Sequence, residues 1–255
     1  MIDLRILSRR RLLKAGTLGG AGLLLSGCDR LNANPAFKGF LADVGQLHVP
    51  AQRLISGDAL AREFSESEMS PLFRANGNTS VEDRGYLQHL ASGFSGWALK
   101  VDGLVKNPLA LPLSALQAMP QRSQITRHDC VEGWSAIGKW QGPQLGAILM
   151  QAGLLPSARF LVFHCADASD GVPYYESIDL AEAFHPQTIL AWRMNGQPLP
   201  LAHGAPIRLR VERQLGYKQA KYVMRIEARV ALAGLYAGKG GYWEDNRGYQ
   251  WFAGI

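Results

Sequence analysis

Short stretches of alternating or continuous apolar residues recur along this chain. Five of them have the length of a β-strand: 97–101, 159–163, 188–194, 207–211 and 222–226. Two are followed by dipeptides typical of tight turns, Asp102-Gly103 and Asn195-Gly196. In 207–211 and 222–226 apolar residues alternate with basic ones, which predicts half-buried strands.

Helical patterns are fewer and shorter. Residues 114–119 predict one short helix. Residues 142–153 predict another, with Leu145, Ile148 and Leu149 on one face and Gly153 as its end. Strands and short helices are mixed along the chain, so the expected fold class is a strand-rich α+β domain.

The amino terminus carries two export features in the expected order. Ser8 to Lys14 includes three consecutive arginines and fits a twin-arginine signal, and the apolar stretch 15–25 that follows is too short to span a bilayer. Leu25-Ser26-Gly27-Cys28 resembles a lipoprotein-processing box, in which the cysteine becomes the lipidated first residue. Twin-arginine export carries proteins that are already folded. The prediction is a lipid-anchored protein on the periplasmic side of the inner membrane, and Asp29 resembles a retention signal there.

These features divide the chain into a signal peptide (1–27), a lipid-anchored polar arm (28–70) and one domain (71–255). The whole chain has 27 basic and 21 acidic side chains. Removing the five basic residues and one acidic residue of 1–27 leaves 22 and 20, a net charge of +2. Much of the high pI therefore belongs to the signal, and nucleic acid is not an expected partner.

The main chemical feature is a thiol at Cys130, within RHDCVEGWSAIGKW (127–140). A short strand-like stretch, 124–126, precedes it, and nearby positive groups favour the thiolate form that binds metals. No second cysteine lies at metal-clip spacing, so the usual paired-cysteine zinc pattern is absent. Cys165 is the other cysteine of the domain, and a disulfide with Cys130 is open in an oxidising compartment.

The segment around Cys130 closely resembles the cysteine loop of the sulfite oxidase-type molybdopterin-binding oxidoreductases. The resemblance covers roughly residues 70–255 and continues in three further segments: 163–200, 203–227 and 240–255. It is strongest to the compact bacterial branch of the family, which includes periplasmic protein-methionine-sulfoxide reductase. It implies the fold of that family's molybdopterin-binding domain, a Mo-molybdopterin cofactor and Cys130 as the molybdenum ligand.

The resemblance also implies a set of cofactor-binding positions: Asn76, Cys130, Cys165, His203, Arg208, Gln219, Ala220 and Lys221. The last four include the cations expected to hold the pterin phosphate, because Arg208 offers a bidentate grip and Lys221 a point charge. His203 stands where relatives usually have asparagine, and Cys165 where some have threonine.

Glu132, two residues after the thiol, is the second candidate catalytic residue. An ionised carboxylate there would repel sulfite, whereas a protonated one could give a proton to a departing oxygen. The expected reaction is therefore two-electron reduction of a small-molecule or protein-bound sulfoxide, with sulfite oxidation as the alternative. The chain has no Cys-x-x-Cys-His haem attachment site. The resemblance to the family implies a membrane haem subunit as the electron-transfer partner.

Two other function classes remain open on these residues. One is a cysteine hydrolase that uses Cys130 with a histidine such as His203 and needs no cofactor. The other is a lipid-anchored zinc or copper binder that uses Cys130, His128 and Cys165. Neither explains the 203–227 segment or a need for export in the folded state.

Overall fold

The computed structural model describes residues 34–37, 49–54 and 57–255. The chain divides into two compact units, Met1–Gly57 and Asp58–Ile255, and in the first of them residues 35–37 and 49–54 are helical. The signal features and Cys28 lie outside the described residues, so the expected division at residue 27 stays a prediction. Within the described part of the chain, no helix combines the length and apolar character needed to cross a membrane.

The second unit contains three sheets. The five-stranded sheet has the order β2-β1-β11-β5-β6, the four-stranded sheet β3-β4-β8-β9, and β10 pairs with β7. The strands are β1 (Ala98–Gly103), β2 (Leu109–Pro112), β3 (Gln121–Asp129), β4 (Ser135–Pro143), β5 (Phe160–Ser169), β6 (Val172–Asp179), β7 (Ile189–Ala191), β8 (Arg193–Met194), β9 (Gln197–Pro198), β10 (Arg208–Arg210) and β11 (Val223–Arg229). All pairings are antiparallel except β1 with β11.

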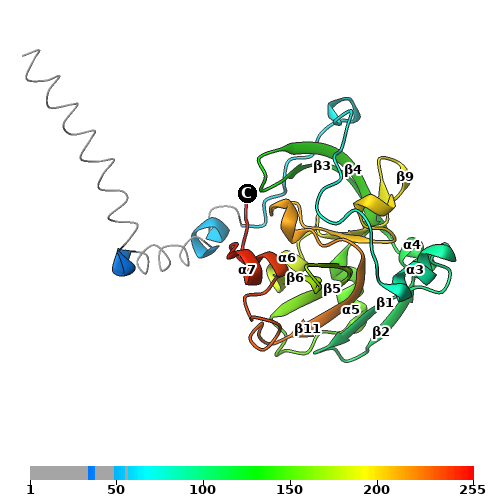
Figure 1. The fold of residues 1–255 in the computed structure, drawn as a ribbon. Helices are drawn as coiled ribbons and strands as arrows, with labels where there is room; N and C mark the ends of the chain where they lie inside the picture. The colour runs from blue at the N-terminus through cyan, green and yellow to red at the C-terminus, as the bar shows by residue number, and fades with distance from the viewer. Residues whose placement is uncertain (1–33, 38–48, 55–56) are drawn as a thin grey trace, which may run out of the picture. The chain divides into compact units, whose positions relative to one another are not determined.

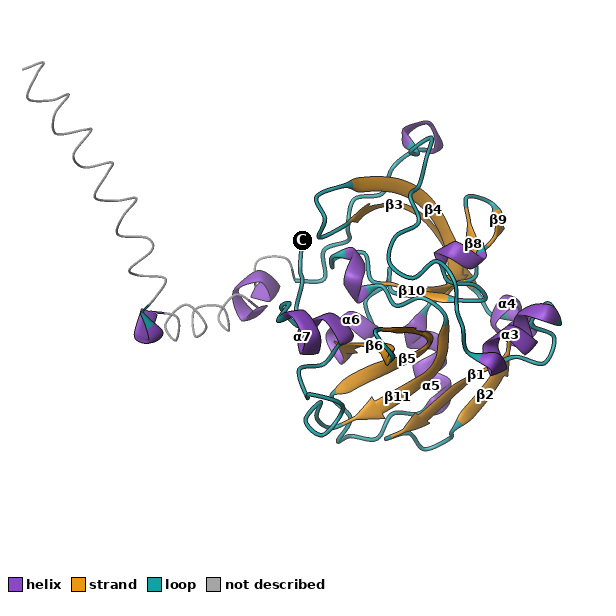
Figure 2. Ribbon diagram, viewed as in Figure 1, coloured by secondary structure: helices purple, strands orange, loops and turns teal. Residues whose placement is uncertain are grey.

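The helices of this unit are short. They are α3 (Arg84–Ala91), α4 (Leu113–Ala118), α5 (Leu145–Ala152), α6 (Leu180–Ala183) and α7 (Tyr242–Arg247), with 3-10 turns η1 (Glu66–Glu68), η2 (Leu201–His203) and η3 (Gly216–Lys218). Figures 1 and 2 show the β3–β4 hairpin on one side of the domain, the five-stranded sheet on the other, and β10 between them. The strand-rich α+β class expected from the sequence is confirmed.

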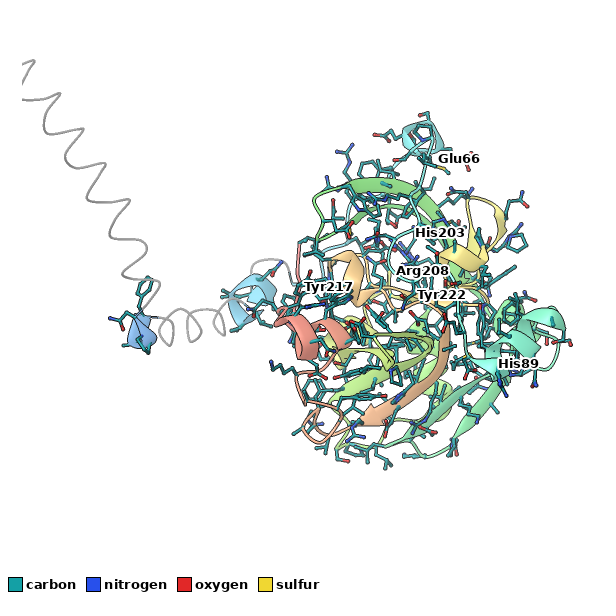
Figure 3. All side chains as sticks on the ribbon, in the orientation of Figure 1. Glu66, His89, His203, Arg208, Tyr217 and Tyr222 are labelled. Atoms are coloured by element: carbon teal, nitrogen blue, oxygen red, sulfur yellow. The ribbon has the colours of Figure 1, made fainter. Side chains whose placement is uncertain are left out.

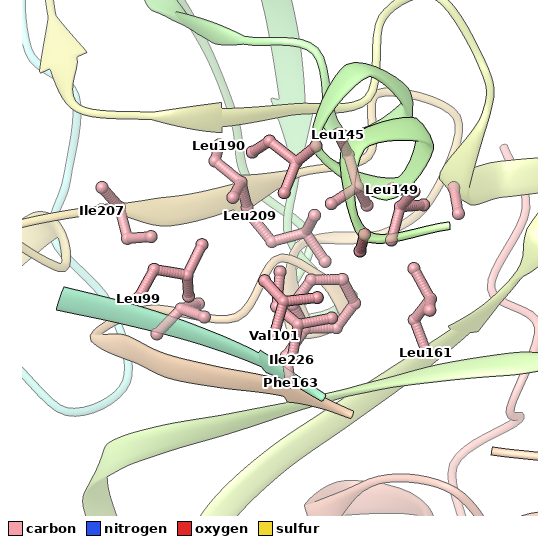
Figure 4. Close-up of a cluster of buried hydrophobic side chains, with 14 of the residues drawn as sticks. Leu99, Val101, Leu145, Leu149, Leu161, Phe163, Leu190, Ile207, Leu209 and Ile226 are labelled. Atoms are coloured by element: carbon pink, nitrogen blue, oxygen red, sulfur yellow. The ribbon is translucent and has the colours of Figure 1, made fainter. Parts of the chain in front are cut away.

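The main core lies between the five-stranded sheet and α5 (Figure 4). Leu145, Ile148 and Leu149 form the buried face of α5, as the sequence predicts, and each such side chain contributes roughly 1.5–3 kcal/mol. The helix ends at Gly153, whose left-handed φ of 67° suits glycine. The predicted start at residue 142 is wrong, because Gly142 belongs to β4. A side chain there would overlap the main-chain carbonyl of Leu190.

The burial predicted for the strand that forms β10 was also wrong. The alternation in 207–211 predicts a half-buried strand, but all three residues of β10 are buried. The reason is its position between the two larger sheets, where its basic side chains have protein on both sides. Arg208 and Arg210 are thus rare buried cations, and each needs a specific environment.

Most other predicted elements are confirmed, but the single strand predicted over 188–194 is wrong, because the chain there forms β7 and β8, which belong to different sheets. Residues 97–101 and 159–163 fall in β1 and β5, 114–119 corresponds to α4, and β11 is half-buried as expected. Asn195 and Gly196, both at positive φ, form the turn between β8 and β9. The turn predicted at Asp102-Gly103 comes later, because these residues still pair with β11 and the chain reverses at 104–108.

Residues 61–70 pack along the β3–β4 hairpin. The main chain of Phe64 donates to the carbonyl of Ile125 at 2.9 Å, and that of Ser70 donates to Ile137 at 3.0 Å. Ala61 exchanges hydrogen bonds with the Gln187 side chain at 2.7 and 2.9 Å. This segment therefore extends the layer formed by β3 and β4. The boundary at residue 70, predicted between the lipid-anchored arm and the domain, stays a prediction.

Candidate active site

A cavity of about 380 Å³ lies within the second unit. Seven of the predicted site residues line it: Asn76, Cys130, Glu132, His203, Arg208, Gln219 and Lys221. Figure 3 shows His203 and Arg208 near the middle of the domain, and Tyr217, which also lines the cavity, toward the side of α7. Residues from positions 76 to 221 of the chain thus meet around one space.

Cys130 is placed by a tight loop at the end of β3. Its amide donates to the carbonyl of Trp134 at 2.9 Å, and its own carbonyl accepts from Gly133 at 3.0 Å. Gly133 has a φ of 85°, which a residue with a side chain would adopt only with strain. The amide group of Asn76 lies 3.5 Å from the Cys130 sulfur as a hydrogen-bond donor. The loop therefore presents a half-buried thiol to the cavity, with one side-chain donor directed at the sulfur.

Glu132 lies at the exposed rim of the cavity. Its carboxylate accepts a hydrogen bond of 3.3 Å from the indole of Trp134. The guanidinium of Arg74, also on the cavity wall, lies 5.9 Å from the centre of a Trp134 ring. Arg127, in contrast, pairs with Asp129 at 2.9 Å and does not line the cavity. The rim therefore holds one carboxylate and one cation, and both lie next to Trp134.

Arg208 lies at the buried end of the cavity. Its guanidinium donates to the carbonyls of His203 (3.1 Å) and Gln219 (3.2 Å), and its Nε is buried with no partner. Burial and the nearby Arg210 lower its pKa to about 9. A guanidinium with a low pKa and an unused donor is well suited to gain an anion.

Lys221 faces the same space. Its ammonium donates to the carbonyls of Asn76 (2.8 Å), Asn78 and Ala202 (3.1 Å). Burial and Arg208 lower its pKa to about 8. Among the residues that the structure describes, neither Lys221 nor Arg208 forms an ion pair with a carboxylate. Two neighbouring cations, Arg208 buried and Lys221 half-buried, have no counter-charge and favour an anionic ligand.

His203 forms part of the wall beside these cations. Its ring contacts Phe73 edge to face, with 5.7 Å between the ring centres. Burial, Arg208 and Lys221 lower its pKa to about 4, so the imidazole is neutral near pH 7. The next residue, Gly204, has a φ of 107°, and a side chain on it would come within 2.7 Å of the Lys221 side chain. Close packing thus holds His203 and Lys221 side by side.

His128 also lines the cavity, although it was predicted as a ligand only in the alternative of a zinc or copper binder. Its Nδ1 lies 3.0 Å from the guanidinium of Arg210, so Nδ1 accepts and the proton of the neutral ring sits on Nε2. Arg210 is in turn held by Glu212 through bonds of 3.0 and 2.6 Å. The strand period of two places His128 and Cys130 on the same face, and that signal was available in the sequence.

Two predicted residues lie elsewhere. Cys165 lines a neighbouring cavity of about 870 Å³, which shares Gly77 and Asn78 with the first. Burial raises the pKa of its thiol well above the usual range, with Asp167 adding to the effect. Ala220 is buried in the core, and its carbonyl accepts from Leu209 at 2.8 Å. Cys130 and Cys165 are both free, so the disulfide left open by the sequence is not formed.

Aromatic residues from three distant segments complete the wall: Tyr174, Tyr217, Trp243 and Tyr249. Trp243 and Tyr249 stack with ring centres 5.6 Å apart, and Tyr217 meets Tyr249 at 5.0 Å. The sequence analysis missed this wall, because its members are separated by up to 75 positions and no local pattern connects them. Within the described residues, no cluster of three or more His, Cys, Asp or Glu side chains is arranged to hold a metal.

Comparison with known proteins identifies the family. Residues 88–232 match the model of the oxidoreductase molybdopterin binding domain, and the chain belongs to that family. It is a molybdopterin-binding oxidoreductase, as the resemblance in its sequence implied.

Two relatives are similar over most of the chain. A protein of Azospira oryzae, proposed to be protein-methionine-sulfoxide reductase subunit YedZ1, is 38% identical over 96% of this chain and 87% of its own length. The protein-methionine-sulfoxide reductase catalytic subunit MsrP of Ralstonia nicotianae is 32% identical over 86% of this chain and 67% of its own. Among solved structures, the sulfane dehydrogenase SoxCD of Paracoccus pantotrophus has a TM-score of 0.52 and 20% identity. That match covers 71% of this chain and 47% of the other, and it shows the fold alone.

The residues of the cavity fit the family's cofactor. Arg208 has an unused buried donor, and it and Lys221 have no carboxylate partner, which matches the needs of a phosphate. The half-buried thiol of Cys130 is free and opens on the same cavity, as a metal ligand requires. Groups suited to binding a phosphate and a group suited to binding a metal therefore face the same cavity. Their individual roles stay predictions.

Proposed function

We propose that this protein reduces sulfoxides, with methionine sulfoxide in proteins as the substrate class. The observation that carries the proposal is the position of Glu132 on the rim of the cavity that also contains the Cys130 thiol. The names of the Azospira and Ralstonia relatives support the substrate class. We assign Cys130 as the molybdenum ligand and Glu132 as the proton donor.

The reaction consumes two electrons and two protons and yields a thioether and water. When bound, the molybdenum cofactor supplies the oxygen-atom and electron transfer. Cys130 would hold the metal, and Asn76 would donate a hydrogen bond to its sulfur, as it does in the structure. Arg208 and Lys221 would hold the pterin phosphate, with Gln219 and His203 beside it. Glu132, hydrogen-bonded to Trp134, is placed to deliver a proton at the open side.

Sulfite oxidation remains the second candidate because of one observation. Arg74 lines the rim and could attract an anionic substrate. Its exposed guanidinium faces Trp134, which also contacts the carboxylate of Glu132. Arg74 attracts sulfite, but the Glu132 carboxylate at the same rim repels it, whereas a sulfoxide has no net charge for that carboxylate to repel and can accept a proton from the protonated group. We therefore favour the sulfoxide.

A direct assay separates the two candidates. Protein purified with its native signal is first analysed for molybdenum and pterin. It is then given methionine sulfoxide with reduced viologen as the electron donor, and sulfite with an artificial acceptor. We expect rapid oxidation of the viologen and little turnover of sulfite. Faster turnover of sulfite would overturn the proposed reaction, although not the family.

The location and the electron donor belong to the same proposal. The twin-arginine pattern and Cys28 support a periplasmic domain held at the inner membrane by lipid, with a membrane haem subunit as the partner. Replacing Arg9 and Arg10 by lysine should leave the precursor in the cytoplasm. Cys28→Ser should release the domain into the periplasmic fraction or block its processing, because the acyl chains would be lost. A Cys28→Ser protein still in the membrane fraction would contradict the lipid anchor.

A further inference from the structure

Three fully buried charged groups meet behind the aromatic wall of the cavity. The ammonium of Lys218 lies 2.6 Å from a carboxylate oxygen of Glu176 and 2.5 Å from one of Glu244. All three side chains are at most 1% exposed. The cavity does not include any of them, and the proposed reaction does not use them. Buried ions persist in this way only when each is paired, so the three groups form one unit.

Each member of this triad belongs to a different element and is close in sequence to a residue of the wall. Glu176 is on β6, two positions after Tyr174, so both side chains are on one face of the strand. Lys218 follows Tyr217 on η3. Glu244 follows Trp243 on α7. The triad thus connects the three segments that carry the wall.

The surroundings of the triad leave little freedom. A side chain at position 241 would overlap carboxylate oxygens of both Glu244 and Glu176, so only glycine allows this approach. Burial raises the pKa of Glu176, opposed by Lys218 and reinforced by Glu244. Burial lowers the pKa of Lys218, but the two carboxylates outweigh it and the net change is upward. The ammonium is therefore charged and cannot leave its two partners without isolating a buried charge.

The structure assigns Lys218, Glu176 and Glu244 a positioning role: they hold the aromatic wall in the place where it contacts the chain that carries the substrate sulfur. This inference rests on the proposed function for its substrate. The methylene groups of a methionine side chain gain free energy when they are buried against aromatic rings. Methionine sulfoxide within a peptide is long enough to use such a wall beyond its sulfoxide group, whereas dimethyl sulfoxide has only two methyl groups. The triad would then favour the longer substrate.

The test uses the full-length holoenzyme and a pair of matched variants. Glu244→Leu removes one of the two carboxylate partners of Lys218 at similar size, whereas Glu244→Gln keeps an acceptor oxygen. Helix α7 retains a second attachment in both, because the Tyr175 hydroxyl bonds to Asp245. Asp102→Asn is the control, since it weakens an ion pair with Arg225 that does not line the cavity. Each protein is assayed with N-acetylmethionine sulfoxide and dimethyl sulfoxide, and its molybdenum is measured.

We expect Glu244→Leu to raise KM for the methionine derivative about tenfold, the size expected when about two methylene groups lose their buried contacts. Its KM for dimethyl sulfoxide, its kcat and its molybdenum content should stay near those of the wild type. Glu244→Gln and Asp102→Asn should resemble the wild type with both substrates. An equal change in KM for both substrates, or a loss of molybdenum, would overturn the positioning role.

Amide hydrogen exchange gives a readout that needs no substrate. In Glu244→Leu, exchange should become faster in 242–247 and 216–218 while β5 keeps its protection. Unchanged exchange, or faster exchange throughout the domain, would contradict the inference. If Glu244→Leu does not fold, Lys218→Met combined with Glu176→Gln and Glu244→Gln is used instead, because it removes all three buried titratable groups together. A wild type that reduces neither sulfoxide would refute the proposed function, and exchange would still test the positioning.

Discussion

The two ends of the cavity are built in different ways. At the buried end, Arg208 and Lys221 make five hydrogen bonds, all to main-chain carbonyls. At the open end, Cys130 and Glu132 each accept one hydrogen bond from a side chain. The first pair is held rigidly by the main chain, and the second is largely free to interact with a ligand.

This difference suits the buried end to holding the cofactor and the open end to taking part in the reaction. Rigid cations without a counter-charge can bind an anion with little loss of conformational freedom. A thiol and a carboxylate with few contacts can bind a metal or move a proton. Changes at the buried end should therefore alter the amount of bound cofactor. Changes at the open end should alter turnover per bound cofactor.

Cys130→Ser should have the largest effect. We expect complete loss of sulfoxide reduction, because the hydroxyl of serine is a poor substitute for a thiolate at a metal. The molybdenum spectrum should change in the protein that still contains pterin. Full activity of this variant would show that the metal ligand lies elsewhere.

Arg208→Met should come next and should act on binding. Charge-assisted hydrogen bonds contribute roughly 1.5–3 kcal/mol each, so pterin affinity should fall about 10- to 100-fold. Pterin fluorescence and molybdenum analysis of the purified protein measure this loss. Arg225→Met is the matched control, since Arg225 is paired with Asp102 outside the cavity. Normal pterin content in Arg208→Met would mean that the two ends do not differ as we propose.

Glu132→Gln should reduce turnover without loss of cofactor. General acid catalysis contributes roughly 10²- to 10⁴-fold, so kcat for the sulfoxide should fall by about 100-fold. Molybdenum per protein should equal that of the wild type. Glu66→Gln serves as the control, because Glu66 is an exposed glutamate of η1 that pairs with Lys139 of β4. A Glu132→Gln protein depleted in molybdenum would mean that this carboxylate helps to bind the cofactor and would contradict its role in turnover alone.

Cys165→Ser should have the smallest effect. The thiol is in the neighbouring cavity, and burial keeps it protonated by raising its pKa. Serine has nearly the same size, so we expect kcat and molybdenum content within about twofold of the wild type. An inactive Cys165→Ser protein would show that the two thiols had been ranked wrongly.

The sequence predicted more of the fold than of the site. Period-two patterns identified strands such as 159–163, and Gly153 marked the end of α5, because these signals are local. Resemblance to a family brought together Asn76, Cys130 and Arg208, which are far apart in the chain. No periodicity could have done so.

The errors share a physical cause. Gly142 looks like part of an amphipathic helix, but it is a glycine because β7 passes against it. Arg208 and Arg210 look like solvent-facing residues, but β10 runs between two sheets. The aromatic wall depends on three segments that meet only in the folded chain. In each case the structure depends on contacts with residues that are distant in sequence, and a local pattern carries no information about them.

The contacts of Lys221 have a consequence for the order of folding. Its ammonium binds the carbonyls of Asn76 and Asn78, which are 145 and 143 positions away in the chain. Before contacts of such high sequence separation can form, a long loop of the chain must close, and this costs conformational entropy. We therefore expect these contacts to form late in folding. Until they form, the segment that carries Asn76 is not fastened beside the thiol of Cys130. We therefore expect an interval, late in folding, in which a bulky cofactor can enter before this segment closes over it.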